Sequence, residues 1–370
     1  MVSFKYLAII IFSLSFFASC GRVTAQNLQQ WNTNTEKTLI DLSELQYGGP
    51  GKDGIPSIDN PEFVSNSQAG KWLSDKEPVI SLVSGGEARA YPLQILIWHE
   101  IVNDRISGEP VLVTFCPLCY SAIVFERTVD GEVLEFGVSG LLRNADLVMY
   151  DRKTETFWQQ FTGRAIVGDY VPSRLKQIPS QIISFKQFRD SYPDGKVLYR
   201  ETGFDKNYGS NPYAGYDDVD NPPAFLEGVE TGKLPPMEKV IGVKMGKKTK
   251  GYPYSITKEE KVINDNFGNT QIVVFHMDGA LSALDETAIA ESREDGSTGV
   301  FKRKIEGQTL TFELRSNNIY DIQTQSQWNI TGKAVDGPLK GTQLKTVTYG
   351  DYFAFAWLVF WPKTEIYKHK

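Results

Sequence analysis

The sequence predicts a mainly β fold in which one β-rich unit occurs twice as a pseudo-symmetric pair, with few short helices. The first observation is a series of short β-branched or aromatic runs separated by Gly, Asp or Pro, a pattern typical of strands joined by turns. The second is an internal repeat, and the third is the scarcity of long amphipathic helical patterns. With 370 residues, 41% hydrophobic and 23% charged, the chain is long and apolar enough to bury a large core.

The strand-like runs follow a Gly- and Pro-rich stretch over residues 48–61, which predicts an ordered loop. Residues 93–102 fit either a short helix or a strand. The segment Val129-Asp130-Gly131-Glu132 predicts a tight hairpin turn. The runs predicted as strands cover residues 78–83, 88–92, 111–115, 122–127 and 133–138.

The repeat sets the domain organisation. When the two copies of the repeat are aligned, Cys116 corresponds to His276 and Trp158 corresponds to Trp328. We therefore predict one globular unit over residues 41–370, built from repeats at about 75–180 and 236–350 with a long connection between them. A connection of that length without regular structure is typical of a functional or interface loop. The pairs that share a shift of 161 residues are Val79 with Val240, Tyr91 with Tyr252, and Asn103 with Asn264.

Residues 1–20 have the pattern of an export signal, with an apolar run followed by Ala18-Ser19-Cys20. Small residues before a cysteine are typical of a lipoprotein signal, in which Cys20 becomes the lipidated N-terminus. The alternatives are ordinary secretion and an uncleaved anchor. We expect residues 21–40 to form a flexible tether, and the protein to be lipid-anchored at a membrane of the cell envelope, facing outside the cytoplasm.

The segment Cys116-Pro117-Leu118-Cys119 joins two strand-like runs and carries two of the three cysteines in the chain. A Cys-x-x-Cys turn outside the cytoplasm has three interpretations: a metal site, a redox-active dithiol or a structural disulfide. The redox interpretation has a difficulty, because thioredoxin-like motifs open a helix, whereas residues 121–127 have a strand pattern.

Of the three histidines, His99 lies just before the strand that leads to Cys116, and His276 opens the equivalent turn of the second repeat. If these histidines and the two cysteines converge, they form a Cys2His2 set, which suits Zn(II) when it is tetrahedral and closed and copper when it is thiolate-rich and less regular. We expect copper first and zinc second. The alternative is that each histidine is a hydrogen-bonded core residue.

A second group of polar residues lies between the predicted strands of the first repeat. Arg143, Asn144 and Trp158 could line a pocket, with Arg143 as a contact for an anion. A similar segment occurs in the second repeat at residues 314–318. A segment present in both repeats is as consistent with a framework turn as with a pocket.

Several classes of function are excluded by what the sequence contains. The net charge of −6 argues against nucleic acid as a partner. The chain has no Gly-rich phosphate loop, so no nucleotide cofactor is expected. A His-dependent hydrolase is also disfavoured, because only three histidines are present and they form no legible triad.

Five motifs occur in order along the chain: Asp53-Gly54-Ile55-Pro56, the Phe115 to Cys119 segment, the Gly137 to Asn144 segment, Trp158-Gln159-Gln160 and the Leu234 to Val243 segment. In these motifs, over about residues 45–365, the chain resembles the bacterial and archaeal family known as domain of unknown function 3179. That resemblance implies a single architectural unit in an exported context, and the family has no assigned activity.

We therefore predict an exported, membrane-anchored protein that binds a transition metal through Cys116, Cys119, His99 and His276. The first alternative is a thiol-disulfide oxidoreductase that uses Cys116 and Cys119. The second is a non-catalytic binding or scaffold module. The sequence identifies neither a reaction nor a protein partner.

Overall fold

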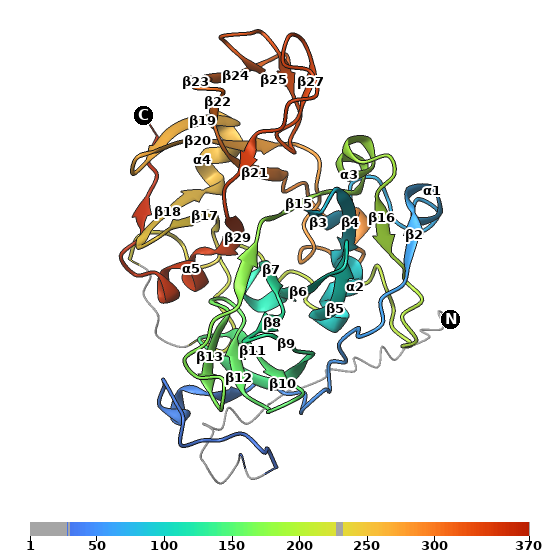
Figure 1. The fold of residues 1–370 in the computed structure, drawn as a ribbon, viewed down its shortest axis with the longest axis vertical. Helices are drawn as coiled ribbons and strands as arrows, with labels where there is room; N and C mark the ends of the chain where they lie inside the picture. Colours follow the sequence, from blue (N-terminus) through green and yellow to red (C-terminus); the bar gives the residue numbers. More distant parts are fainter. Residues whose placement is uncertain (1–27, 29, 227–231, 370) are drawn as a thin grey trace, which may run out of the picture.

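The computed structural model describes residues 28, 30–226 and 232–369. The described part is mostly β, which confirms the predicted main class. Figure 1 shows the earlier half of the chain in blue to green and the later half in yellow to red, each built around its own sheets. Among the described residues, no helix is long and apolar enough to cross a membrane.

Within the described residues, the first half of the chain forms sixteen strands. They are β1 (Gln46–Tyr47), β2 (Phe63–Ser65), β3 (Pro78–Ser84), β4 (Glu87–Pro92), β5 (Ile101–Ile106), β6 (Glu109–Cys116), β7 (Ser121–Glu126), β8 (Thr128–Val129), β9 (Glu132–Val133), β10 (Phe136–Arg143), β11 (Asp146–Asp151), β12 (Phe157–Gln159), β13 (Arg164–Val167), β14 (Lys176–Ile178), β15 (Ser180–Ser184) and β16 (Lys196–Leu198).

The part of the second half that the structure describes forms fourteen strands, and every helix in the described ranges is short. The strands are β17 (Lys239–Met245), β18 (Lys248–Pro253), β19 (Val262–Phe267), β20 (Thr270–Met277), β21 (Ser297–Lys302), β22 (Lys304–Ile305), β23 (Gln308–Thr309), β24 (Phe312–Arg315), β25 (Asn318–Asp321), β26 (Gln327–Trp328), β27 (Ala334–Asp336), β28 (Lys345–Thr346), β29 (Tyr349–Phe353) and β30 (Glu365–Ile366). The helices are α1 (Asn66–Ala69), α2 (Leu93–His99), α3 (Phe185–Ser191), α4 (Tyr254–Glu260) and α5 (Ala354–Phe360), and the 3-10 turns are η2 (Leu42–Glu44), η3 (Pro117–Cys119) and η4 (Ile289–Glu291).

The sheets of the two halves follow the same strand orders. The sheet β15-β3-β4-β16-β2 corresponds to β29-β17-β18-β30, and β14-β7-β6-β5 corresponds to β28-β21-β20-β19. The ribbon β10-β11-β12-β13 corresponds to β24-β25-β26-β27, and the small hairpin β8-β9 corresponds to β22-β23. Each half therefore builds the same three larger sheets and one hairpin in the same order along the chain.

The halves contact one another reciprocally. Strand β15 of the first half packs on β21 of the second, and β29, the equivalent of β15, packs on β7, the equivalent of β21. Two copies related by a two-fold rotation make contacts of this kind. Aromatic rings reinforce the junction, because the Phe161 ring lies 4.7 Å from that of Tyr352 and 4.6 Å from that of Phe360.

Local sequence explains the turns. Asp130 and Gly131 both have positive φ, as a two-residue hairpin turn requires, and they join β8 to β9 as predicted. The ambiguous stretch 93–102 divides into helix α2 and the start of β5. The division falls at Glu100, which has a left-handed conformation that ends the helix.

The predicted tether over residues 21–40 is wrong for its later part. Trp31 is buried, and its ring packs edge-on against Tyr150 and Phe157. The Thr33 hydroxyl donates to the Glu155 carbonyl at 2.6 Å. Burial of a large indole outweighs the polar composition of the segment and fixes it to the first half. The predicted signal and Cys20 lie outside the described residues.

Candidate metal centre

The two cysteines lie on one hairpin. Cys116 is the last residue of β6, and Pro117 to Cys119 form the single 3-10 turn η3. Tyr120 then takes a left-handed conformation, and β7 returns along β6 with Ser121 opposite Cys116. Proline suits the first position of such a turn, because its φ is fixed and no backbone N–H is needed there. The hairpin thus holds both sulfurs at one strand end.

A second hairpin supplies a carboxyl group at the same place. Asn144 and Ala145 both have positive φ and form a tight turn between β10 and β11. Asp146 is the first residue of β11 and is fully buried. The Cys119 thiol lies 3.5 Å from the Ala145 carbonyl oxygen, to which it donates, and this contact joins the two hairpins.

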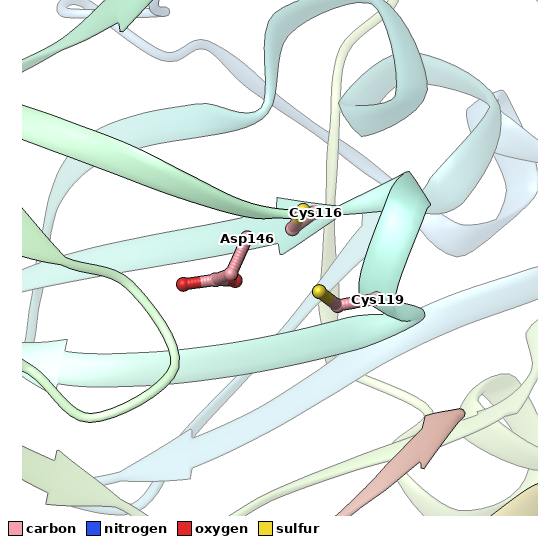
Figure 2. A group of neighbouring side chains, drawn as sticks. All are labelled: Cys116, Cys119 and Asp146. Carbon is pink, nitrogen blue, oxygen red and sulfur yellow. The ribbon is translucent and has the colours of Figure 1, made fainter. Parts of the chain in front are cut away.

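The three side chains form the candidate metal centre (Figure 2). One ligand atom from each of Cys116, Cys119 and Asp146 lies within 4.8 Å of the other two. Among the described residues, no other group of three or more His, Cys, Asp and Glu side chains meets this condition. The Oδ1 atom of Asp146 is buried without a hydrogen-bond partner, so one carboxylate oxygen is left for a ligand.

Neighbouring side chains hold Asp146 in place. Its Oδ2 atom accepts hydrogen bonds from Gln159 Nε2 at 2.6 Å and from the Phe161 backbone N–H at 2.9 Å. Arg143 Nη1 in turn donates to Gln159 Oε1 at 3.2 Å. Partners of this kind orient a metal ligand and are part of many metal sites.

The next residue, Gln160, holds the cysteine hairpin. Its Nε2 atom donates to Thr114 Oγ1 at 2.7 Å and to the Ser121 carbonyl at 3.1 Å. Its Oε1 atom accepts from the Ser121 hydroxyl at 2.8 Å. The Trp158-Gln159-Gln160 segment therefore fixes both hairpins of the candidate centre.

Burial determines the electrostatics of the three groups. It raises the pKa of Cys116, and it raises the pKa of Cys119 well above the ordinary value for a thiol. Burial also raises the pKa of Asp146 to about 7, although the hydrogen bonds from Gln159 and Phe161 act in the opposite direction. Without a cation, all three groups therefore favour their protonated, neutral forms below pH 7.

His99 does not join this group. Its Nδ1 lies 2.7 Å from the Pro56 carbonyl oxygen, which only accepts, so Nδ1 carries the proton. Its Nε2 then accepts from the Tyr208 hydroxyl at 2.6 Å. Burial lowers the pKa of His99 to about 4. With both nitrogens engaged and the ring outside the cluster, His99 is a neutral core residue.

His276 is placed similarly, and the predicted equivalence with Cys116 is wrong by one residue. The backbone N–H of His276 donates to the Lys261 carbonyl as that of Phe115 donates to the Glu100 carbonyl, so His276 corresponds to Phe115. A one-residue slip turns a strand side chain to the opposite face. Its Nε2 lies 2.8 Å from the Asp295 carbonyl oxygen and its Nδ1 lies 2.8 Å from the Thr257 hydroxyl. The predicted Cys2His2 set is therefore not formed among the described residues.

The predicted pocket residues belong to the framework. Arg143 forms two hydrogen bonds with Glu44 Oε2, at 2.9 and 2.6 Å, and Asn144 is a turn residue. Trp158 is fully buried and donates from Nε1 to Asp151 at 3.0 Å. Trp328 donates to Asp321 at the same distance. Because the same tryptophan–aspartate hydrogen bond occurs in both halves, these residues are more consistent with a framework than with a pocket. Of the three predicted pocket residues, Arg143 is connected to the candidate centre, through its hydrogen bond to Gln159.

The geometry gives little support to thiol-disulfide exchange. An exchanging thiol needs exposure and a lowered pKa, whereas both cysteines are buried with raised pKa values. The 3-10 turn is a single turn with Cys116 as its N-cap, and the Cys116 side chain forms no capping hydrogen bond. The two cysteines are not joined by a disulfide.

The second half has other residues at the corresponding positions. By strand pairing Met277 corresponds to Cys116. Trp158 pairs with Met149 and Trp328 pairs with Ile319, which aligns Asn318, the first residue of β25, with Val148. The hairpin of the second half is therefore shorter and has no strand residue at the position of Asp146. Met277 and Asn318 line a groove of about 560 Å³ between α3 and the second half. The sulfur-carboxyl group is thus a feature of the first half of the fold.

Sequence reasoning found the two cysteines and missed Asp146. The available signal was the two-residue turn Asn144-Ala145, which presents the next residue at a strand start, but contact between this turn and the cysteine hairpin depends on tertiary packing. The structure therefore defines a β-rich protein with a buried sulfur-carboxyl group able to hold a metal ion.

Residues 52–364 match the family described as Protein of unknown function (DUF3179). The match covers most of the chain, so the protein belongs to this family. A search of curated proteins and a search of solved structures each found no match.

Proposed function

We propose that the protein binds a transition-metal ion through Cys116, Cys119 and Asp146. The observation that carries this proposal is the convergence of one buried ligand atom from each of Cys116, Cys119 and Asp146, together with the Oδ1 atom of Asp146, which lacks a hydrogen-bond partner. Buried polar atoms are normally satisfied, so an unpartnered carboxylate oxygen on a side chain beside two sulfurs favours a cation as its partner. A bound divalent ion would compensate the charges that burial otherwise suppresses.

The donor set favours zinc over copper. Sulfur ligands suit both Zn(II) and Cu(I), but a carboxylate oxygen suits Zn(II) better than the softer Cu(I). The copper-first order expected from sequence was made for a Cys2His2 set, and the structure places both imidazoles elsewhere. We therefore propose zinc first and copper second.

The proposed location rests on the sequence. The apolar run before Ala18-Ser19-Cys20 supports export and lipid attachment at Cys20. The metal centre would then function in the cell envelope, outside the cytoplasm, on a protein held to the membrane by its N-terminal lipid.

The test is metal content by mass spectrometry on the full-length protein, purified without chelator, beside a variant with Cys116→Ser and Cys119→Ser. The proposal predicts near-stoichiometric zinc in the wild type and none in the variant. Reconstitution of reduced, metal-free protein with Zn(II) and with Cu(I) in separate samples decides the metal. Failure of both ions to bind the reduced wild type would reject the proposal.

A further inference from the structure

Glu100 is a buried acidic residue whose backbone is fixed beside the candidate centre. It ends α2 with φ of 58°, and its N–H donates to the Leu96 carbonyl at 2.7 Å. Its own carbonyl accepts from the Phe115 N–H at 2.8 Å. Glu100 is thereby held next to the residue that precedes Cys116.

The Glu100 carboxyl group has no conventional partner. The residue is 7% exposed, and within the described ranges its carboxyl group forms no hydrogen bond or ion pair. Burial raises the pKa of Glu100 to about 8, with a further contribution from the charge of Asp146. Glu100 in turn contributes to the raised pKa of Cys116. Glu100 therefore lies close enough to Asp146 and Cys116 for the charges of these groups to interact.

The second half shows where a side chain at this backbone position reaches. Lys261 corresponds to Glu100, with φ of 57° and a carbonyl that accepts from the His276 N–H. Its Nζ atom contacts Asp278 Oδ1 at 2.5 Å. Asp278 directly follows Met277, the equivalent of Cys116. A long side chain at this position therefore extends to the chain just beyond the strand end, which in the first half is the Cys-x-x-Cys turn.

We propose that Glu100 is the fourth ligand of the metal centre, completing a closed set with Cys116, Cys119 and Asp146. This inference rests on the proposed function and specifies it further. Four protein ligands in a tetrahedral arrangement are typical of structural zinc sites, whereas catalytic sites keep a position open for water. Glu100 lies outside the 4.8 Å group, so the assignment requires its side chain to rotate inward when the ion binds. A second carboxylate also strengthens the preference for Zn(II) over Cu(I).

The consequence is a metal that stabilises the first half of the fold. The four ligands come from the end of α2, the end of β6, turn η3 and the start of β11. One ion would join three separate parts of the fold in a dry environment. We therefore assign the centre a structural role, with no metal-bound water.

The test is titration of the full-length, reduced, metal-free protein with Co(II), which reports coordination by its visible spectrum. Glu100→Gln should retain the sulfur-to-cobalt charge-transfer bands, shift the ligand-field bands and weaken binding more than about 10-fold, because a ligand carboxylate is lost. Glu100→Asp should bind with intermediate affinity. The matched control is Glu77→Gln, since Glu77 is also buried but hydrogen-bonds to Ser74 and Gln94, and it should bind like the wild type.

The outcomes separate the two proposals. Wild-type protein that acquires no cobalt bands would overturn the metal proposal and with it the role of Glu100. Wild-type binding that Glu100→Gln leaves unchanged in affinity and spectrum would overturn only the fourth-ligand assignment. A cooperative thermal unfolding transition of each metal-free variant shows that the variant is folded. If Glu100→Gln does not fold, the affinity and spectrum of Glu100→Asp decide whether Glu100 is the fourth ligand.

Discussion

Replacing Asp146 with asparagine should stabilise the metal-free protein while weakening metal binding. The asparagine carbonyl can accept the two hydrogen bonds that Asp146 Oδ2 receives from Gln159 and Phe161. Its amide removes the negative charge from the buried position. Asparagine has nearly the same size and shape as aspartate, so the substitution requires no change of the backbone.

The size of the effect follows from the pKa. Burial raises the pKa of Asp146 from 3.8 to about 7. Between these values the folded state retains a proton that the unfolded state releases, so stability falls as pH rises, by about 1.4 kcal/mol per pH unit. Above pH 7 the loss has reached its full value, at most about 4 kcal/mol. Asp146→Asn should recover much of that loss at pH 8 and almost none at pH 4.

The assay is chemical denaturation of reduced, metal-free wild type and variant at pH 4, 6 and 8, where the difference between the two curves isolates this residue. The same proteins are then compared by zinc competition titration, in which the variant should bind more weakly. A variant that is less stable than the wild type at pH 8, or a difference that does not change with pH, would refute the reasoning.

Three other predictions concern the histidines, the protons and the tryptophans. Replacing His99 or His276 with alanine should leave zinc affinity, measured by competition titration, unchanged. Chemical denaturation should show a loss of stability of about 1–3 kcal/mol per lost buried hydrogen-bonding group. A loss of zinc binding in either variant would show that the imidazole is a metal ligand. Zinc binding should release protons from the thiols and the carboxyl group, which calorimetry in buffers of different ionisation enthalpy should detect. The zinc affinity should therefore rise from pH 6 to pH 8. A zinc affinity that does not depend on pH would contradict the raised pKa values. Trp158→Phe and Trp328→Phe should lower the free energy of unfolding by similar amounts, because each variant loses a 3.0 Å hydrogen bond to a buried aspartate. If denaturation experiments show a much larger loss for one of the two variants, the two tryptophans do not have equivalent framework roles.

The sequence predicted the fold class well because strands and turns have local signals. The predicted turn at Asp130-Gly131 is the turn of a hairpin in the structure. Tyr91 and Tyr252, which mark the repeat in the sequence, lie on strands that pair in the same way in the two halves. The predicted tether failed at Trp31, because its burial depends on the partner rings of Tyr150 and Phe157 and not on its polar neighbours.

The candidate centre was only half predicted. Cys116 and Cys119 are brought together by a local turn, which sequence spacing reports directly. Asp146 reaches them through contact between two hairpins, for which the chain gives no local signal. His276 was misplaced because an alignment error of one residue, harmless for naming a strand, reverses the face on which a side chain lies.

The most direct test of the central claim is X-ray absorption at the zinc edge of the zinc-loaded, full-length protein. Coordination by Cys116, Cys119 and carboxylate oxygens predicts two sulfur neighbours at about 2.3 Å and oxygen neighbours at about 2.0–2.2 Å, with no imidazole scattering. A shell without sulfur, or one with the outer-shell scattering of histidine, would contradict the account.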